Sequence, residues 1–310
     1  MKVEKLHLEL TRMCTIECEH CFRGERRNEF MSINTIDNIF KDVSEVEFLL
    51  LTGGEPLLAL RQIKELLNII NKKNIKIDKI LLVTNCTVLN NDIITTLNEL
   101  SNDSDFYLRL SYDMFHYIEL NRLNLLEKRK ENADILKEKF NALEYSDYTK
   151  VQNKHKEMIY AIGKAANLTL KRLDEINVMG NTNYDFNFAE IIPDSFPDYT
   201  SYVEEDNELY GIVTIDVNGN VVSYSLPFDE EDREANVYDS NVNKHGLLNA
   251  SLNYIKNKNQ DEFKKRTKKI CENIKNKFKN ASLNKIWSAH NNAIGFKKWI
   301  FERKCTFFIV

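Results

Sequence analysis

The segment Leu10-Thr-Arg-Met-Cys-Thr-Ile-Glu-Cys-Glu-His-Cys-Phe22 places three cysteines in one short loop. Cys14, Cys18 and Cys21 have the spacing CxxxCxxC, directly after an alternating stretch typical of a strand and before a helical stretch. Such a loop can wrap around an iron–sulfur cube and ligate three of its irons, because cysteine thiolates are the usual ligands of these clusters. The fourth iron then has no protein ligand, and an open metal position is typical of catalytic sites.

The same cysteines could instead bind zinc, with His20 as the fourth ligand. Zinc sites usually combine two CxxC pairs across a longer stretch, and this sequence has no second pair. His20 lies between Cys18 and Cys21, where it would have difficulty completing a tetrahedron with its neighbours. The spacing therefore favours the cluster, as a hypothesis that a second motif has to support.

That second motif is Gly53-Gly54-Glu55-Pro56, which follows the apolar run 46–51 of a predicted buried strand. Two glycines let the backbone approach a ligand without a Cβ, and Glu55 can accept hydrogen bonds from an ammonium. Together the two motifs resemble the radical S-adenosylmethionine (radical SAM) superfamily. The resemblance implies that the open iron binds SAM and that Gly53 to Pro56 hold its methionine amino group.

The resemblance also implies the chemistry. SAM would be cleaved reductively at one [4Fe–4S] cluster, giving methionine and a 5′-deoxyadenosyl radical that abstracts hydrogen from a bound substrate. Electrons would come from a donor such as flavodoxin or ferredoxin. His20 and Phe22 resemble family positions that flank the adenine, although the family usually has an aromatic residue where His20 stands.

Polar residues at the ends of later predicted strands resemble family positions that contact the SAM ribose and carboxylate. These residues are Asn85, Ser111, Asp113 and Lys164, the last in a Gly-Lys-Ala segment that ends the predicted strand 158–166. Asn85 could equally be an ordinary turn residue, and Asp113 the N-cap of a helix.

Strand parity gives a further hypothesis. His7 and Glu9 share one face of the first strand, and Tyr107, Arg109 and Ser111 share one face of the fourth. Charged residues within apolar strands are costly unless they are paired or bound to a ligand. We therefore expect Glu9 and Arg109 to line the cavity and hold SAM or substrate, with a mutual salt bridge as the alternative.

The order of elements predicts an α/β fold. Strands alternate with helices, which implies a parallel sheet whose active site lies at the carboxyl ends of the strands. We expect residues 1–200 to form a partial (β/α)6 TIM-type barrel. The predicted strands are 5–10, 46–51, 79–85 and 105–111, and the predicted helices are 32–43, capped by Ser32, 57–73 and 91–100.

Residues 201–310 are expected to form a C-terminal extension of a β-hairpin and helices. Asn218-Gly219 within 208–225 predicts a hairpin with a type I′ turn. This hairpin resembles the one that opens the SPASM and twitch extensions of peptide-modifying radical SAM enzymes. Its outgoing strand carries Ser223 and Ser225 where those enzymes start an auxiliary cluster with a cysteine, so we expect no second cluster.

Composition limits the partners. The chain has 310 residues, 43% hydrophobic and 29% charged, and a net charge of −4, so no global basic field favours nucleic acid or an anionic membrane. No stretch approaches a membrane span or a signal peptide, and the six cysteines suit a reducing compartment, so we expect a cytoplasmic protein. The Lys-rich segment 252–279 is typical of a surface helix; a docking surface for an acidic peptide or nucleic acid is the alternative.

Two substrate classes stay open. The hairpin favours a ribosomally made peptide, whereas the compact size and single cluster favour a small metabolite or nucleotide. A third hypothesis is a non-enzymatic metal-binding regulator, in which the motif at 53–56 would have no purpose.

Overall fold

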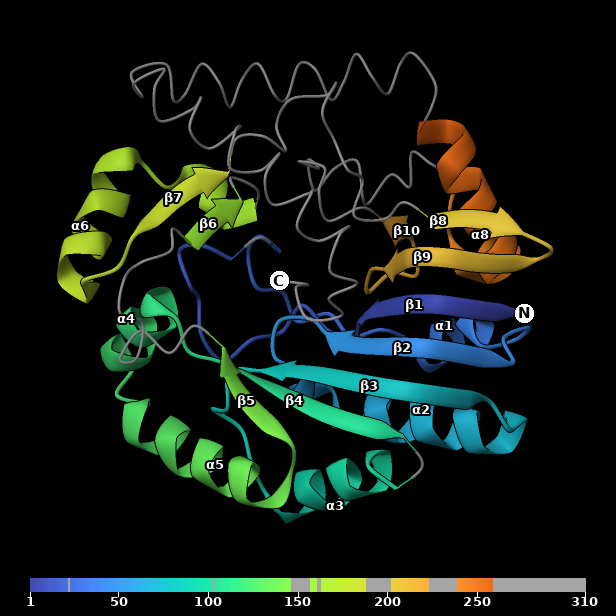
Figure 1. Ribbon diagram of the computed structural model, residues 1–310, viewed down its shortest axis with the longest axis horizontal. Coiled ribbons are helices and arrows are strands. Elements are labelled where there is room, and N and C mark those ends of the chain that lie inside the picture. Colours follow the sequence, from blue (N-terminus) through green and yellow to red (C-terminus); the bar gives the residue numbers. More distant parts are fainter. Residues whose placement is uncertain are drawn as a thin grey trace, which may run out of the picture.

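The computed structural model describes residues 1–21, 23–102, 104–145, 157–160, 163–187, 202–222 and 239–258. Within these ranges, strands and helices alternate along the chain and build one mostly parallel sheet (Figure 1). This confirms the predicted α/β class with an open, partial barrel. The prediction of two domains divided at residue 200 stays a prediction.

The main sheet has eight strands in the order β10-β9-β1-β2-β3-β4-β5, with β8 also paired to β9. Neighbouring strands from β1 to β5 are parallel, and β9 is parallel to β1, whereas β8 and β10 are antiparallel to β9. A separate parallel pair is formed by β6 and β7. The strands are β1 Lys2–Glu9, β2 Glu45–Thr52, β3 Lys76–Thr84, β4 Asp105–Ser111, β5 Ala142–Tyr145, β6 Glu157–Tyr160, β7 Tyr184–Asn187, β8 Tyr202–Glu205, β9 Glu208–Ile215 and β10 Val221–Val222.

Most helices begin at a side chain that caps the first turn. Ser32, Asn90, Asp113 and Thr169 each accept a hydrogen bond from a backbone N–H three residues later, which satisfies one of the donors that a helix start leaves free. The α-helices are α1 Ile33–Ile39, α2 Leu60–Lys73, α3 Asn91–Leu100, α4 Met114–Arg122, α5 Leu126–Lys139, α6 Leu170–Gly180 and α8 Val242–Lys258; the 3-10 helices are η1 Pro56–Ala59 and η2 Gly163–Asn167.

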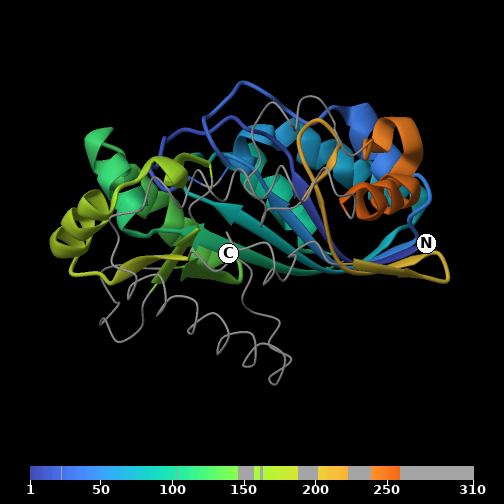
Figure 2. The ribbon, with the colours of Figure 1, turned by 90° about the horizontal axis from the view of Figure 1, so that it is seen from above.

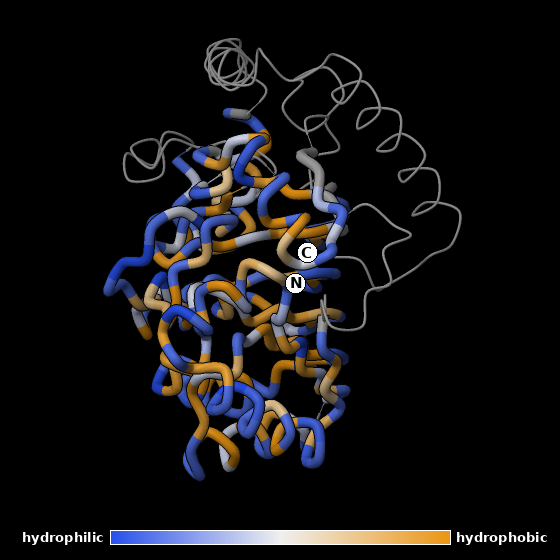
Figure 3. The backbone as a smooth tube through the Cα atoms, turned by 90° about the vertical axis from the view of Figure 1, so that its left-hand side faces the viewer, coloured by the Kyte–Doolittle hydropathy of each residue, from blue (hydrophilic) through white to orange (hydrophobic). Residues whose placement is uncertain are grey.

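The main hydrophobic core lies between the sheet and the helices on one of its faces. Leu6 and Leu8 of β1 are fully buried on this side, and helices α1, α2 and α8 cover it (Figure 2). Hydrophobic and hydrophilic residues interleave along the described chain (Figure 3), as expected of strands whose faces meet different surroundings. His7 and Glu9, which alternate with Leu6 and Leu8 in the second half of β1, therefore point to the opposite, inward face.

Several predicted elements differ from the structure. The helix predicted over 32–43 ends at Ile39, with Phe40 as its C-cap. The segment 57–73 begins as the 3-10 helix η1 before α2, with Glu55 capping its start. The Gly-Lys-Ala segment does not end a strand: β6 stops at Tyr160, and Gly163 has a left-handed φ of +57° and starts η2. A left-handed residue cannot continue an extended strand, so the apolar pattern of 158–166 misled the prediction.

The hairpin at 208–222 forms, but its turn is different from the prediction. Asn218 does not have the positive φ that a type I′ turn requires; only Gly219 does, at +85°. The buried carboxylate of Asp216 instead accepts hydrogen bonds from the backbone N–H groups of Asn218 and Asn220, at 2.9 and 2.8 Å. This side chain stabilises a longer turn.

The turn with two left-handed residues lies one connection earlier. Asp206 and Asn207, with φ of +52° and +64°, join β8 to β9. The sequence prediction did not include β8. Residues 223–238 and 259–310, with most of the Lys-rich segment, lie outside the described residues. No helix that the structure describes combines the length and the apolar character needed to cross a membrane.

We expect Asn207→Ala to lower the free energy of unfolding by about 1 kcal/mol. A left-handed φ brings Cβ close to the backbone, and the short polar side chain of Asn tolerates this clash better than that of Ala does. Asn207→Gly should lower it by much less, because glycine adopts this φ without the clash. Urea unfolding of both variants measures the difference. Equal losses in the two variants would contradict the assigned turn.

Candidate metal and cofactor site

The cysteine loop begins where β1 ends, at the carboxyl edge of the sheet. The Leu10 N–H donates to the Thr52 carbonyl, which ties the exit of β1 to the end of β2. Cys14, Cys18 and Cys21 follow as free thiols, with Cys18 buried and the other two partly buried. The loop therefore presents three unpaired thiols at the edge where parallel sheets carry their active sites.

The spacing of the three sulfur atoms bears on the choice between zinc and a cluster. All three cysteines are described, and at least one pair of their sulfurs is more than 4.8 Å apart. Around one zinc ion they would be about 3.8 Å apart, since each Zn–S bond is about 2.3 Å. The wider arrangement fits ligands that bind different irons of one cluster.

Burial also shapes the chemistry of these thiols. It raises the pKa of Cys14 to about 12, and it raises the pKa of Cys18 and Cys21 as well. Thiolates in this loop consequently need positive charge beside them. Bound metal ions supply such charge and deprotonate a coordinating thiol outright, so the donor set suits irons that the loop would enclose.

The motif at 53–56 packs directly on the cysteine loop. The Gly54 N–H donates to the Thr11 carbonyl at 2.7 Å, and the Glu55 N–H donates to the Met13 carbonyl at 2.8 Å. A Cβ at Gly54 would overlap the Met13 carbonyl, and one at Gly53 would overlap that of Thr11. From the sequence, we expected these glycines to let the backbone approach a ligand. In the structure they let the backbone of the cysteine loop come close.

Glu55 joins the ends of three elements. Its buried carboxylate accepts hydrogen bonds from the Leu57 N–H at 3.1 Å, the Thr84 hydroxyl at 2.8 Å and the Asn85 N–H at 2.8 Å. Burial raises the pKa of Glu55 to about 7, against the effect of these three donors. Pro56, also buried, is the first residue of η1. The carboxylate thus holds the edge of the sheet together.

Asn85 links the end of β3 to the cysteine loop. Its Nδ2 donates to the Thr15 hydroxyl at 3.2 Å and lies 3.5 Å from the Cys14 sulfur, while its Oδ1 accepts from the Thr87 N–H. The next residue, Cys86, has a left-handed φ of +62°. Asn85 is therefore the turn residue weighed from sequence and also a neighbour of the predicted metal ligands.

Asp113 caps α4 and also reaches the cysteine loop. Its Oδ1 accepts from the His116 N–H, and its Oδ2 lies 2.7 Å from His116 Nδ1 and 3.1 Å from His20 Nε2. Burial acts to raise the pKa of Asp113, but the two histidines outweigh it and hold this pKa well below its usual range. The His20 ring stacks on Phe115 with centroids 4.4 Å apart. The structure thus brings His20 and Asp113 together.

Residues of η2 and α6 hold the other side of the loop. The Lys164 N–H donates to the Cys21 carbonyl at 2.8 Å, and its Nζ lies 3.4 Å from Glu25. Arg172 of α6 makes two hydrogen bonds to the Glu19 carboxylate, at 2.6 and 2.9 Å. Sequence reasoning found Lys164 but missed Arg172, whose only signal is a charge on a helix.

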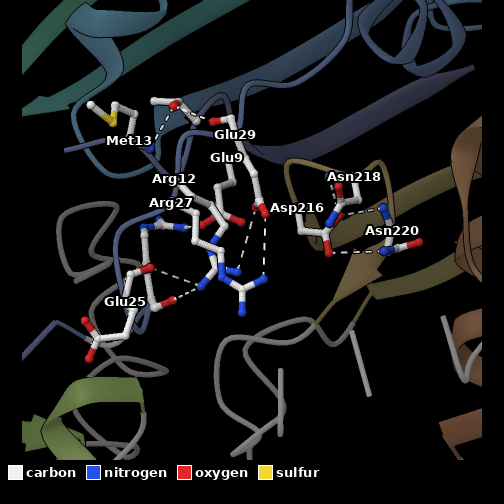
Figure 4. A network of polar contacts seen from close by, with 11 residues as sticks. Glu9, Arg12, Met13, Glu25, Arg27, Glu29, Asp216, Asn218 and Asn220 are labelled. Atoms are coloured by element: carbon white, nitrogen blue, oxygen red, sulfur yellow. Dashed lines mark hydrogen bonds and ion pairs between the residues drawn. The ribbon is translucent and has the colours of Figure 1, made fainter. Parts of the chain in front are cut away.

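Arg23 is the main residue that sequence reasoning missed. It follows the cysteines and is buried against β1 and β2, where its Nη1 donates to Glu9 at 2.9 Å and its Nη2 donates to the Thr52 hydroxyl at 2.8 Å. Figure 4 shows Glu9 among the arginines of this segment, Arg12 and Arg27. Glu9 therefore has a cationic partner from the cysteine loop.

Arg109 and Ser111 lie on β4, farther along the sheet. Arg109 is half-buried and stands in register with Val83 and Leu143, and the Ser111 carbonyl accepts from Arg129 at 3.4 Å. The structure places both on the inward face, as parity predicted. Phe22 lies outside the described residues.

Comparison with known proteins adds the family. A family profile described as the Radical SAM superfamily matches residues 8–185, which is more than half of the chain. The chain belongs to the radical SAM superfamily. Membership implies an iron–sulfur cluster and SAM, and it makes the protein a radical SAM enzyme. Comparison with curated protein sequences gives no match.

Solved structures of this superfamily resemble the chain at low identity. One is native anSMEcpe with bound AdoMet and Cp18Cys peptide, at 14% identity and a TM-score of 0.45, covering 86% of this chain and 82% of that one. Another is Streptococcus suis SuiB bound to precursor peptide SuiA, at 14% identity and a TM-score of 0.47, covering 85% of this chain and 66% of that one.

In this radical SAM enzyme we expect Gly54→Ala to reduce iron binding severalfold, because the added methyl group displaces the Met13 carbonyl and with it the cysteine loop. Iron per chain after anaerobic reconstitution measures the effect. Gly180→Ala is the matched control, since its Cβ would meet the movable side chain of Met114. Normal iron content in Gly54→Ala would refute the proposed constraint.

We expect Glu55→Gln to lower the free energy of unfolding by about 1–3 kcal/mol, because the amide NH₂ would face one of the three donors and leave it unsatisfied. Chemical denaturation of the iron-free protein measures this loss. Asp92→Asn, at an exposed carboxylate on α3, should change the stability much less. A Glu55→Gln variant as stable as the wild type would contradict the assigned role.

Proposed function

We propose that this enzyme binds one [4Fe–4S] cluster through Cys14, Cys18 and Cys21 and uses SAM to abstract hydrogen from a peptide substrate. The observation that carries the proposal is the cysteine loop, held against Gly53–Glu55 at the carboxyl end of an open parallel sheet. When bound, the cluster supplies the electron that cleaves SAM to a 5′-deoxyadenosyl radical. All other steps depend on how the chain positions its ligands.

In this proposal, different residues near the loop contact different parts of SAM. In this proposal Gly53, Gly54, Glu55 and Pro56 flank the methionine end, where backbone carbonyls can accept from its ammonium. His20 and Phe22 flank the adenine. The remaining SAM contacts are assigned to Asn85, Arg109, Ser111, Asp113 and Lys164.

A peptide substrate is supported by the shape of the sheet and by the hairpin. In the described residues the strand order runs from β10 to β5 without closing, so the partial barrel has an opening between these two strands. The hairpin of β9 and β10, which resembles peptide-modifying relatives in sequence, forms one edge of this opening. An electron donor such as flavodoxin or ferredoxin and a reducing, cytoplasmic location belong to the same proposal.

We expect the anaerobically reconstituted protein to form 5′-deoxyadenosine from SAM when a strong reductant is added, because an open iron can bind and reduce SAM. Cys18→Ala should abolish the product. Cys86→Ala should retain it, since Cys86 is a buried cysteine outside the CxxxCxxC loop. Liquid chromatography with mass spectrometry measures the product.

The possible outcomes test the cluster assignment and the substrate class separately. Wild-type protein that binds no iron would overturn the cluster assignment. Protein that binds iron and SAM but forms product only after a peptide is added would support the peptide class. Product that depends on a small metabolite instead would replace the peptide with that substrate.

A further inference from the structure

On the inward face of the sheet, one buried polar side chain of β1 and one of β9 carry an atom that has no hydrogen-bond partner among the described residues. Nε2 of His7 and Oγ1 of Thr214 make no hydrogen bond in the described part of the chain. The side chain of His7 is 1% exposed and that of Thr214 is 0% exposed. Buried polar groups are nearly always hydrogen-bonded, so two orphans on one surface need an explanation.

These two residues are neighbours. His7 of β1 stands in register with Thr214 of β9, and side chains at paired positions of adjacent parallel strands project to the same face. On the other side of His7 the row continues with Leu50 of β2, Leu81 of β3 and Tyr107 of β4. On the far side of Thr214 the row continues with Val222 of β10, so the two polar side chains lie together within an otherwise largely apolar row.

The next row toward the cysteine loop contrasts with this one. There Glu9 of β1 stands beside Thr52 of β2, and Arg23 donates a hydrogen bond to each. In that row, Arg23 is a hydrogen-bond donor that belongs to the protein itself. The row of His7 and Thr214 receives no such side chain among the described residues.

The position suits a long substrate. Thr11, where the cysteine loop packs on Gly53, lies four residue steps beyond His7. At about 3.3 Å per step the two levels are about 13 Å apart. An extended peptide covers this distance with about four residues. A peptide that reacts beside the loop can thus place a neighbouring group against His7.

We propose that His7 and Thr214 form a subsite that receives one uncharged amide group of the peptide substrate, through a hydrogen bond to each side chain. The inference rests on the peptide substrate proposed above. An amide offers one acceptor and one donor, and the pair can match them, because a hydroxyl does both and a neutral imidazole has one nitrogen of each kind.

The surroundings favour an uncharged ligand. Burial, together with the charges of Arg23 and Lys5, lowers the pKa of His7 to about 3, so the imidazole is neutral at ordinary pH. Lys5 and Arg23 are themselves paired, with Glu4 and Glu9. A charged ligand group would also have to leave water beside Leu50, which costs free energy.

The test compares Thr214→Val, which removes the hydroxyl at nearly constant shape, with Thr214→Ser, which keeps it. A random displayed peptide pool is panned against the reconstituted wild type with SAM, and the enriched peptide is titrated against every variant. We expect Thr214→Val to weaken binding about tenfold, the effect of one hydrogen bond, and Thr214→Ser to retain it. Thr96→Val, at a buried threonine on α3, is the control and should bind like the wild type.

A separate readout distinguishes binding from structure. Thr214→Val should keep the iron content and thermal midpoint of the wild type, because no group in the described residues makes a hydrogen bond with the hydroxyl. Binding equal to the wild type in Thr214→Val would overturn the subsite. A lower midpoint that accounts for the weaker binding would overturn it too, since the hydroxyl would then be structural.

Failure of the peptide proposal gives a different result. If no peptide is enriched on the wild type, that proposal fails. N-methylacetamide then serves as the amide probe, and its effect on the formation of 5′-deoxyadenosine in the absence of substrate is measured. A response in the wild type and Thr214→Ser that is absent in Thr214→Val would retain the subsite for another amide-bearing substrate. The same response in all three proteins would overturn it.

Discussion

The contact on which the site depends is the backbone pairing between the cysteine loop and the turn after β2. The N–H groups of Gly54 and Glu55 donate to the carbonyls of Thr11 and Met13, so the loop is held as if it were a further strand. Hydrogen bonds of this kind require close approach, and a side chain at Gly54 would fill the space. The positions of the predicted metal ligands are consequently set by a strand end 30 to 40 residues away in the sequence.

Buried polar side chains complete this attachment from several directions. Arg23 ties the loop to Glu9 and Thr52, and Asn85 ties it to the end of β3. Burying such groups is costly unless each is hydrogen-bonded. Here Arg23 has partners on β1 and β2, and Asn85 has a partner in the cysteine loop. A shift of the loop would break several of these bonds together, so the network resists movement of the cysteines more than any single bond would.

Sequence was a good guide where local signals coincide. The predicted β4 and α3 have the same bounds in the structure, because alternation and an Asn90 cap define them without help from the rest of the chain. The hairpin turn was wrong because Asn218-Gly219 is a local signal, whereas the carboxylate of Asp216 decides the conformation. Parity placed Glu9 on the inward face but could not reveal Arg23, which lies in a loop without periodicity.

The inward face has two functions in adjacent rows. Near the cysteine loop, Arg23 donates hydrogen bonds to Glu9 Oε1 and to the Thr52 hydroxyl, and this row stabilises the fold of the site. One row deeper, Nε2 of His7 and Oγ1 of Thr214 have no hydrogen-bond partner in the described part of the chain. Membership of the superfamily fixes the chemistry at the loop, where the motifs are. In our proposal, choice of substrate depends instead on strand residues such as these, which belong to no motif and which the pairing of β9 with β1 brings together.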